Sequence, residues 1–226
     1  MQRELHDHYF KQAKRDGYLS RAAYKLIEID DKRGMLKRGM TVLDAGAAPG
    51  SWLQVISDRV GPKGTVIGVD LKAIQHQFRH DNVRTFEMDM RAMDVDVILE
   101  AIRPAQRFDA IMSDMAPNTT GDRIVDHHGS IRLCEALLDL APTWLKVGGP
   151  LVMKVFEGEA YPTLMSRVQA SFDRVRGAKP KASRSISNEM YIVATGYRGD
   201  AGESGDEQDD MPFELPKRKP STGWGS

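Results

Sequence analysis

Short apolar runs alternate with longer amphipathic stretches along most of the chain. The apolar runs are rich in Val and Ile, end at Gly, Pro or Asp, and span 41–46, 65–70, 83–89, 107–114 and 150–156. The stretches between them have a helical character and span 51–60, 71–79, 91–103 and 129–146. This alternation predicts a parallel sheet that helices cover on both faces.

The two ends of this region complete the pattern. A helix is predicted over 20–34, with Ser20 as its N-cap and an apolar face that repeats at helical spacing. Residues 1–18 are polar and predict an irregular segment or one short helix. The segments 172–180 and 188–197 have no clear helix between them and predict an antiparallel hairpin at the edge of the sheet.

Composition is that of an ordinary globular protein. The chain has 226 residues, of which 41% are apolar and 28% charged, enough for one α/β domain over 1–198. No apolar run approaches the roughly 18 residues of a membrane span, and the N-terminus lacks the apolar stretch of a signal peptide. The single cysteine, Cys134, cannot form an internal disulfide. These features predict a cytoplasmic protein with no membrane partner.

The net charge of zero hides an uneven distribution. The segment 199–226 has seven acidic and three basic residues, and its composition predicts a disordered acidic tail. The remaining body carries four more basic than acidic residues, concentrated over 11–38 and 174–184. Two basic patches suit a polyanionic partner, although a solvated surface explains the charge alone equally well.

The first predicted strand leads into a turn of small residues, DAGAAPGSW, over 44–52. In an open α/β sheet, ligands bind beyond the carboxyl ends of the strands. Gly46 and Gly50 can adopt a positive φ and let a ligand lie on the backbone, and the following helix N-terminus favours a carboxylate. The dinucleotide fingerprint and the P-loop are absent. The turn resembles the D-x-G-x-x-P-G loop that binds S-adenosylmethionine (SAM) in Rossmann-like methyltransferases.

Two acids at the next strand ends support a SAM site. Asp70 ends the second predicted strand, where a carboxylate can accept hydrogen bonds from both ribose hydroxyls, and Asp89 ends the third, beside the adenine amino group. Each acid alone is better explained as a helix cap or turn residue. Together with the glycine turn, they favour cofactor binding. Trp52 fits either core packing or the lining of the pocket.

Four other ionisable residues lie in distinct motifs. Lys25 lies on the first helix in SRAAYKL, and Asp114 follows the fourth strand in SDMAPN. Lys154 lies inside the fifth strand in MKVF, and Glu189 begins the last strand. A lysine in a buried strand is costly unless it is paired or lines a cavity, which favours a functional role for Lys154 over a lysine that reaches water.

Taken together, the motifs resemble those of the FtsJ-type (RrmJ) ribosomal RNA 2′-O-methyltransferases. SRAAYKL, DAGAAPGSW, SDMAPN, KVFEGE and SNEMYIVATG occur in the family's order over about residues 8–197. The resemblance implies a Rossmann-like α/β fold, with a seven-stranded, mostly parallel sheet, an antiparallel last strand and helices on both faces. It also implies SAM as the cofactor and a catalytic tetrad at Lys25, Asp114, Lys154 and Glu189.

The resemblance and the turn together define the expected cofactor site. The family's SAM contacts fall on Gly50, Trp52, Asp70, Asp89 and Asp114, and the turn adds Asp44, Gly46, Ala47 and Pro49. Three features depart from the family's pattern: Ser51 stands where many members carry a second glycine, Glu157 stands where a neutral residue is common, and the acidic tail is additional. None removes a tetrad or SAM residue.

The implied reaction is an in-line displacement, in which a ribose 2′-hydroxyl attacks the methyl carbon of SAM, and the enzyme mainly aligns the reactants. Lys154 is the candidate base and must then be neutral during the attack. A charged Lys154 that holds the hydroxyl and stabilises the developing negative charge is the alternative. No metal is expected, because the pairs His6/His8 and His127/His128 lack a third ligand and fit a polar surface.

The expected partner is ribosomal RNA in the large ribosomal subunit, bound by a monomer. A transfer RNA 2′-O-methyltransferase of the same family, a small-molecule O-methyltransferase and a non-catalytic ribosome assembly factor are the alternatives. Metal-dependent catechol-type enzymes need a cluster of acids for Mg²⁺, which a lysine in mid-strand does not fit. The segment 115–130 is predicted to form a mobile loop over the site, with Asn118 near the substrate.

Overall fold

The computed structural model describes residues 2–183 and 187–199, so the predicted tail lies outside the described residues from position 200 onward. The helices are α1 (Gln2–Asp16), α2 (Ala22–Arg33), α3 (Ser51–Val60), the short 3₁₀ helix η1 (Met90–Ala92), α4 (Val95–Ile102), α5 (Arg123–Trp144) and α6 (Tyr161–Ser171). The strands are β1 (Thr41–Ala45), β2 (Thr65–Asp70), β3 (Val83–Glu87), β4 (Ala110–Ser113), β5 (Leu151–Phe156), β6 (Phe172–Ala178) and β7 (Glu189–Tyr197).

The seven strands form one sheet in the order β3-β2-β1-β4-β5-β7-β6. The strands β1 to β5 pair in parallel, and β7 runs antiparallel to both β5 and β6. The predicted fold is therefore confirmed. The chain moves outward from β1 to β3 and then returns to add β4 on the other side of β1, which creates a switch point where ligands bind in such sheets.

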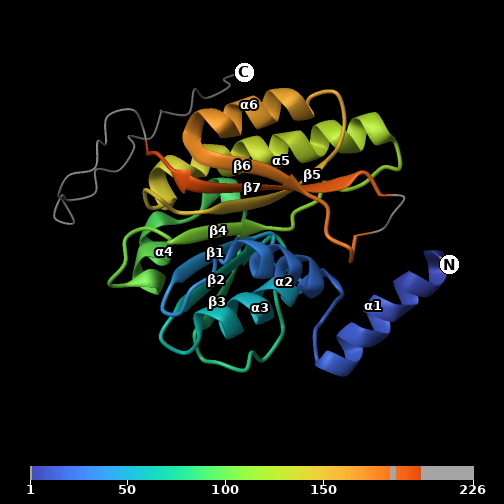
Figure 1. Ribbon diagram of the computed structural model, residues 1–226. Helices are drawn as coiled ribbons and strands as arrows, with labels where there is room; N and C mark the ends of the chain where they lie inside the picture. Colours follow the sequence, from blue (N-terminus) through green and yellow to red (C-terminus); the bar gives the residue numbers. More distant parts are fainter. Residues whose placement is uncertain (1, 184–186, 200–226) are drawn as a thin grey trace, which may run out of the picture.

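Both faces of the sheet are covered (Figure 1), so its central strands are apolar at successive positions. Leu43 and Ile111 contribute to the core beneath α4, α5 and α6. Their neighbours Val42 and Met112 contribute to the second core, beneath α2 and α3. This alternation follows from the two-residue period of a strand and explains why the strands appear in the sequence as short continuous apolar runs.

The prediction of a helix over 71–79 is wrong, because this segment has no regular structure. Ile74 and Phe78 instead pack partly buried against the α2–α3 core and lie near the Cα of Gly50. Both side chains cover the glycine turn, so the backbone between them follows the surface of the turn and does not coil into a helix. The helix α6 is absent from the predicted pattern altogether.

The predicted loop over 115–130 is longer than the irregular segment that the structure has there. The helix α5 begins at Arg123, where the carboxylate of Asp122 accepts hydrogen bonds from the amides of Ile124 and Val125. The irregular segment after β4 is thus shorter than predicted, because this cap starts the helix six residues before position 129. The helix α2 matches its predicted range closely, although its N-cap is Arg21 rather than Ser20.

The predicted antiparallel pairing of β6 and β7 is confirmed, but β7 is not at the edge of the sheet. It lies between β5 and β6, and β6 forms the edge. Residues 2–16 form the helix α1, which projects from the body in Figure 1. None of the described helices is long and apolar enough to cross a membrane.

Candidate active site

The glycine turn lies at the carboxyl end of β1, beside the switch point. Gly46 has φ 75° and Gly50 has φ 113°, both in the left-handed region that favours glycine. The amides of Gly46 and Ala47 donate to the carbonyl oxygen of Val69, at 2.8 and 3.2 Å. A Cβ at Gly46 would overlap the side chain of Met115, which follows β4. The turn is therefore held against β2 and closely approached by the chain after β4.

Asp70 fixes the other side of this turn. Its Oδ2 accepts a hydrogen bond from the amide of Ala48 at 2.9 Å, and its Oδ1 accepts one from the amide of Lys72 at 2.9 Å. The carboxylate is only partly buried, so it keeps acceptor capacity toward the crevice. Pro49 is exposed on the same turn.

Among the predicted site residues, Asp44 has a buried carboxyl that lacks hydrogen-bond partners in the described part of the chain. It is 1% exposed on β1, and neither carboxylate oxygen has a hydrogen-bond partner among the described residues. Burial raises the pKa of Asp44 well above its usual value, and the nearby charges of Asp114 and Asp70 raise it further. Since buried polar groups are normally paired, this carboxyl is suited to a positively charged or donating ligand.

The first turns of α3 connect the glycine turn to α2. The indole N–H of Trp52 donates to the carbonyl oxygen of Ala22 at 2.9 Å. The hydroxyls of Ser51 and Ser20 lie 2.8 Å apart, within hydrogen-bonding distance. The side-chain amide of Gln54 donates to the carbonyl oxygen of Gly17 and accepts from the amide of Leu19, both at 2.9 Å. The start of the helix that carries Lys25 is thus fixed by the helix that follows the predicted SAM turn.

The four residues of the predicted tetrad form two ion pairs. Lys154 Nζ lies 3.1 Å from Asp114 Oδ1 and also donates to the backbone carbonyl oxygen of Asp114, at 2.5 Å. Lys25 Nζ lies 2.6 Å from Glu189 Oε1. All four side chains are largely buried, so these charges are only weakly screened by water. The pairs join residues from α2, the segment after β4, β5 and β7.

Tyr191 connects the two ion pairs and was missed in the sequence. It is fully buried, and its hydroxyl donates to Asp114 Oδ1 at 2.5 Å. Lys25 Nζ lies 5.7 Å from the centroid of its ring, and Trp52 stacks on the ring with centroids 5.8 Å apart. Burial raises the pKa of Tyr191 well above its usual value, with the charges of Asp114 and Glu189 adding to the effect. In the sequence, an aromatic residue in an apolar strand is best explained as core.

Asp89 is not joined to the other predicted site residues. It follows β3 and caps η1, and its carboxylate accepts hydrogen bonds from the backbone and side chain of Arg91. The side-chain hydrogen bond from Arg91 is the largest of the effects that lower the pKa of Asp89. The simpler interpretation of this residue, a cap of the following turn, describes what its side chain does in the structure.

The expectation that His127 lies on a polar surface is wrong. The ring is 3% exposed, and its Nδ1 lies 2.7 Å from the carbonyl oxygen of Phe156, while its Nε2 accepts a hydrogen bond from the amide of Ala160. It fixes the turn between β5 and α6. Gly158 allows this because a Cβ there would meet the ring. Within the described residues, no group of three His, Cys, Asp or Glu could hold a metal ion.

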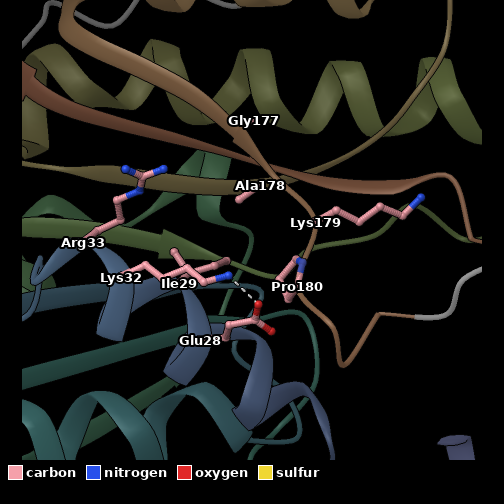
Figure 2. Close-up of a pocket in the computed structure, with 8 residues that line it drawn as sticks. All are labelled: Glu28, Ile29, Lys32, Arg33, Gly177, Ala178, Lys179 and Pro180. Atoms are coloured by element: carbon pink, nitrogen blue, oxygen red, sulfur yellow. Dashed lines mark hydrogen bonds and ion pairs between the residues drawn. The ribbon is translucent and has the colours of Figure 1, made fainter.

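A cleft of about 150 Å³ lies between α2 and the chain after β6 (Figure 2). Residues of the two predicted basic segments line it: Glu28, Ile29, Lys32 and Arg33 from α2, and Gly177, Ala178, Lys179 and Pro180 from β6 and the chain after it. Arg33 and Lys179 are exposed at its rim. Glu28 is engaged by the ammonium of Lys32 at 2.6 Å and by the amide of Lys181 at 2.7 Å.

Comparison with known proteins identifies the family. A family model described as FtsJ-like methyltransferase matches residues 18–197, which include the glycine turn and both ion pairs. The chain belongs to the FtsJ-like methyltransferase family. The sequence resemblance to this family is therefore confirmed, and the protein is a methyltransferase of a kind that uses SAM.

Curated relatives in this family cover most of the chain. A protein of Psychrobacter arcticus named ribosomal RNA large subunit methyltransferase E is 43% identical over 195 residues, which are 86% of this chain and 91% of the relative. A protein of the same name from a Bradyrhizobium species is 45% identical over 202 residues, or 88% and 86% of the two chains.

A solved structure shows the same fold. It is a Plasmodium falciparum protein described as a ribosomal RNA methyltransferase, 32% identical to this chain, with a TM-score of 0.70. The match covers 80% of this chain and 100% of the other.

Proposed function

We propose that this methyltransferase transfers the methyl group of SAM to the 2′-hydroxyl of a ribose in the RNA of the large ribosomal subunit. The observation that carries the proposal is the pair of buried ion pairs, Lys154–Asp114 and Lys25–Glu189, beside the glycine turn. A buried lysine held by one carboxylate is suited to accept or hold a proton from an attacking hydroxyl. The names of the relatives support ribosomal RNA as the substrate.

The residues of the glycine turn fit SAM. The carboxyl of Asp44 is buried without a partner among the described residues, so the cationic methionine part of SAM would satisfy it. Asp70 keeps acceptor capacity for the ribose hydroxyls, and the positive φ of Gly46 and Gly50 gives the turn its tight path. SAM supplies an activated methyl group, and we assign its binding to these residues with Ala47, Pro49, Trp52, Asp89 and Asp114.

The chain's own contribution to the reaction is alignment and proton removal. Asp114 holds Lys154 through its carboxylate and its backbone carbonyl, which fixes the direction of the amine. We infer that Lys154 first releases its own proton to solvent and, as the neutral amine, takes the proton of the 2′-hydroxyl. The Lys25–Glu189 pair is nearly neutral as a unit, so it supplies hydrogen bonds to the ribose while adding little net charge beside Lys154.

Basic residues near the tetrad support an RNA partner. The cleft of Figure 2 lies on α2, the helix that carries Lys25, and on the chain between β6 and β7, the strand that begins at Glu189. We infer that Arg33 and Lys179 contact phosphates of an RNA whose target ribose lies at the proposed tetrad. A 2′-hydroxyl also distinguishes RNA from DNA. The single domain over 1–198, the monomeric state and the cytoplasmic location stay predictions.

Mass mapping of methylated nucleotides tests the proposal. Large subunits from cells that lack the protein should gain one 2′-O-methylated nucleotide when incubated with the protein and SAM. Methylation of purified transfer RNA but not of large subunits would assign the alternative substrate. Methylation of a catechol without RNA activity would show a small-molecule enzyme. Normal ribosome maturation in cells that carry only Lys154→Ala would favour an assembly factor.

A further inference from the structure

Tyr191 occupies a central position between the two ion pairs. It lies on β7 directly opposite Lys154 on β5 in the register of the antiparallel pair. Its hydroxyl donates to Asp114 Oδ1 at 2.5 Å, and Lys154 Nζ lies 3.1 Å from the same oxygen. One carboxylate oxygen is thus shared by a phenol and an ammonium.

The ring of Tyr191 is held as firmly as its hydroxyl. Trp52 stacks on it with an interplanar angle of 28°, and Trp52 is itself bonded to the start of α2. Lys25 Nζ lies 5.7 Å from the ring centroid, a distance at which a cation is attracted to an aromatic ring. Because Tyr191 is fully buried and its ring is contacted by Trp52 and Lys25, the ring cannot move and its hydroxyl has one available position.

We propose that Tyr191 is a positioning residue for methyl transfer, whose hydroxyl holds Asp114 Oδ1 and thereby sets both the direction of Lys154 and the ease with which it gives up its proton. This inference rests on the proposed function of Lys154 as the base. By donating a hydrogen bond to Asp114 Oδ1, the phenol hydroxyl weakens the attraction between this carboxylate and the ammonium of Lys154. Without it, Lys154 keeps its proton more tightly and is less well directed.

Tyr191 itself remains a protonated donor. Burial and the charges of Asp114 and Glu189 raise its pKa well above the ordinary value, so it loses no proton in the range where the enzyme works. Its part is therefore to hold a neighbouring group rather than to exchange a proton with the substrate.

The charges that face Lys154 come from several elements. Asp114 follows β4, Glu189 lies on β7 and Lys25 on α2, while Asp44 on β1 interacts electrostatically with Asp114. On α5, the thiol of Cys134 donates to the Lys154 carbonyl oxygen, and burial raises its pKa to about 12, so it is neutral. Removal of the Tyr191 hydroxyl leaves all of these groups in place, so its effect reports the contacts of that hydroxyl with the carboxylates of Asp114 and Glu189.

Tyr191→Phe tests the inference because it keeps the ring and removes only the hydroxyl. We expect kcat at pH 7 to fall by about tenfold or more, as for loss of a hydrogen bond to a charged group. The pH at which kcat rises should be higher in Tyr191→Phe than in the wild type. The KM for SAM should stay within about twofold of the wild-type value. The matched control is Tyr197→Phe, which removes the hydroxyl of another buried tyrosine on β7.

Two outcomes would overturn the inference: an unmoved pH profile in Tyr191→Phe, or a loss of kcat no larger than that of Tyr197→Phe. A second variant covers the case in which Tyr191→Phe is poorly folded. Replacement of Tyr191 by 3-fluorotyrosine makes the hydroxyl a stronger donor, so the rise of the rate should move to lower pH. A shift to higher pH, or none, would contradict the proposal.

A third measurement needs no activity. In protein labelled with ¹⁵N-lysine, the pH at which the side-chain signal of Lys154 changes should rise in Tyr191→Phe. If large subunits are not methylated but this signal moves, the proposed substrate is wrong while the contact inferred for Tyr191 holds. If wild-type protein methylates RNA but the signal does not move, the inference about Tyr191 fails alone.

Discussion

Asp44 combines deep burial with an unpartnered carboxyl, and this combination has a measurable effect on stability. Its pKa is raised in the folded chain, which therefore binds a proton more readily than the unfolded chain does. A raised pKa makes the contribution of this group to stability greatest at low pH, below the unfolded value. The contribution is lost as the pH rises toward the folded pKa.

We predict that Asp44→Asn abolishes the loss of stability with rising pH and weakens SAM binding by at least about tenfold. Asn cannot ionise, so the ligand-free variant should become more stable relative to the wild type as the pH rises from 5 to 8. The loss of affinity follows because the amide no longer offers a negative charge to the cation. Urea unfolding at the two pH values and calorimetric titration with SAM measure both effects. Equal SAM affinity in the variant would show that the carboxyl does not contact the cofactor.

Lys154 is the residue on which catalysis is expected to depend most. Lys154→Ala should reduce methyl transfer to the background rate, because it removes the amine that we propose takes the proton, while SAM binding should be retained. Lys146→Ala is the matched control, since Lys146 is exposed and its ammonium pairs with Asp109 instead. Single-turnover transfer from labelled SAM measures the loss. Near-native turnover in Lys154→Ala would exclude the base role.

At the scale of elements, α3 contacts the segment before α2. Ser51 is buried and lies within hydrogen-bonding distance of Ser20. The helix that receives the cofactor turn is thereby bonded to the segment that positions Lys25.

A double-mutant cycle on Ser20 and Ser51 should show this connection. Each change to alanine should lower the free energy of unfolding by about 1 kcal/mol, the usual net value of a hydrogen bond. The double variant should lose less than the sum of the two, because both substitutions remove the same contact. Denaturant unfolding of the four proteins measures the coupling. Strictly additive losses would mean that the two hydroxyls do not interact.

At the scale of the whole molecule, the basic segments that are far apart in the sequence meet at one cleft. Residues near position 30 on α2 and near position 180 after β6 line it together. The cleft lies on the same two parts of the chain that supply Lys25 and Glu189.

We predict that the double variant Arg33→Ala/Lys179→Ala binds RNA more weakly across sequences and with a smaller dependence on salt. The slope of log K against log salt should fall by about 1.5, since each lost phosphate contact removes about 0.7 to 0.9. Lys63→Ala/Arg103→Ala is the charge-matched control, because these exposed residues lie at the opposite ends of the strands, before β2 and β4. Filter binding at several salt concentrations measures the slopes, and equal slopes in the two variants would refute the cleft as a phosphate site.

The sequence by itself determined the layers of the fold and supplied the residues of the candidate site. Runs such as 65–70 and 150–156 are buried on both faces, so their composition alone predicts central strands. The turn over 44–52 needs glycines where φ is positive, and this requirement is local. The tetrad was predicted because its four residues lie in recognisable motifs, and the structure shows that they form two ion pairs. Segment 71–79 was predicted wrongly, because Ile74 and Phe78 lie four residues apart, as on a helix, but pack around the glycine turn.

Only the tertiary structure decided which of these residues touch. Lys25 and Glu189 meet because β7 inserts beside β5, an order of strands that no local pattern records. The same insertion places Tyr191 opposite Lys154, where a residue that resembles ordinary core becomes the link between two ion pairs. Partners and burial depend on contacts between distant segments, whereas periodicity and turn chemistry depend on neighbours along the chain.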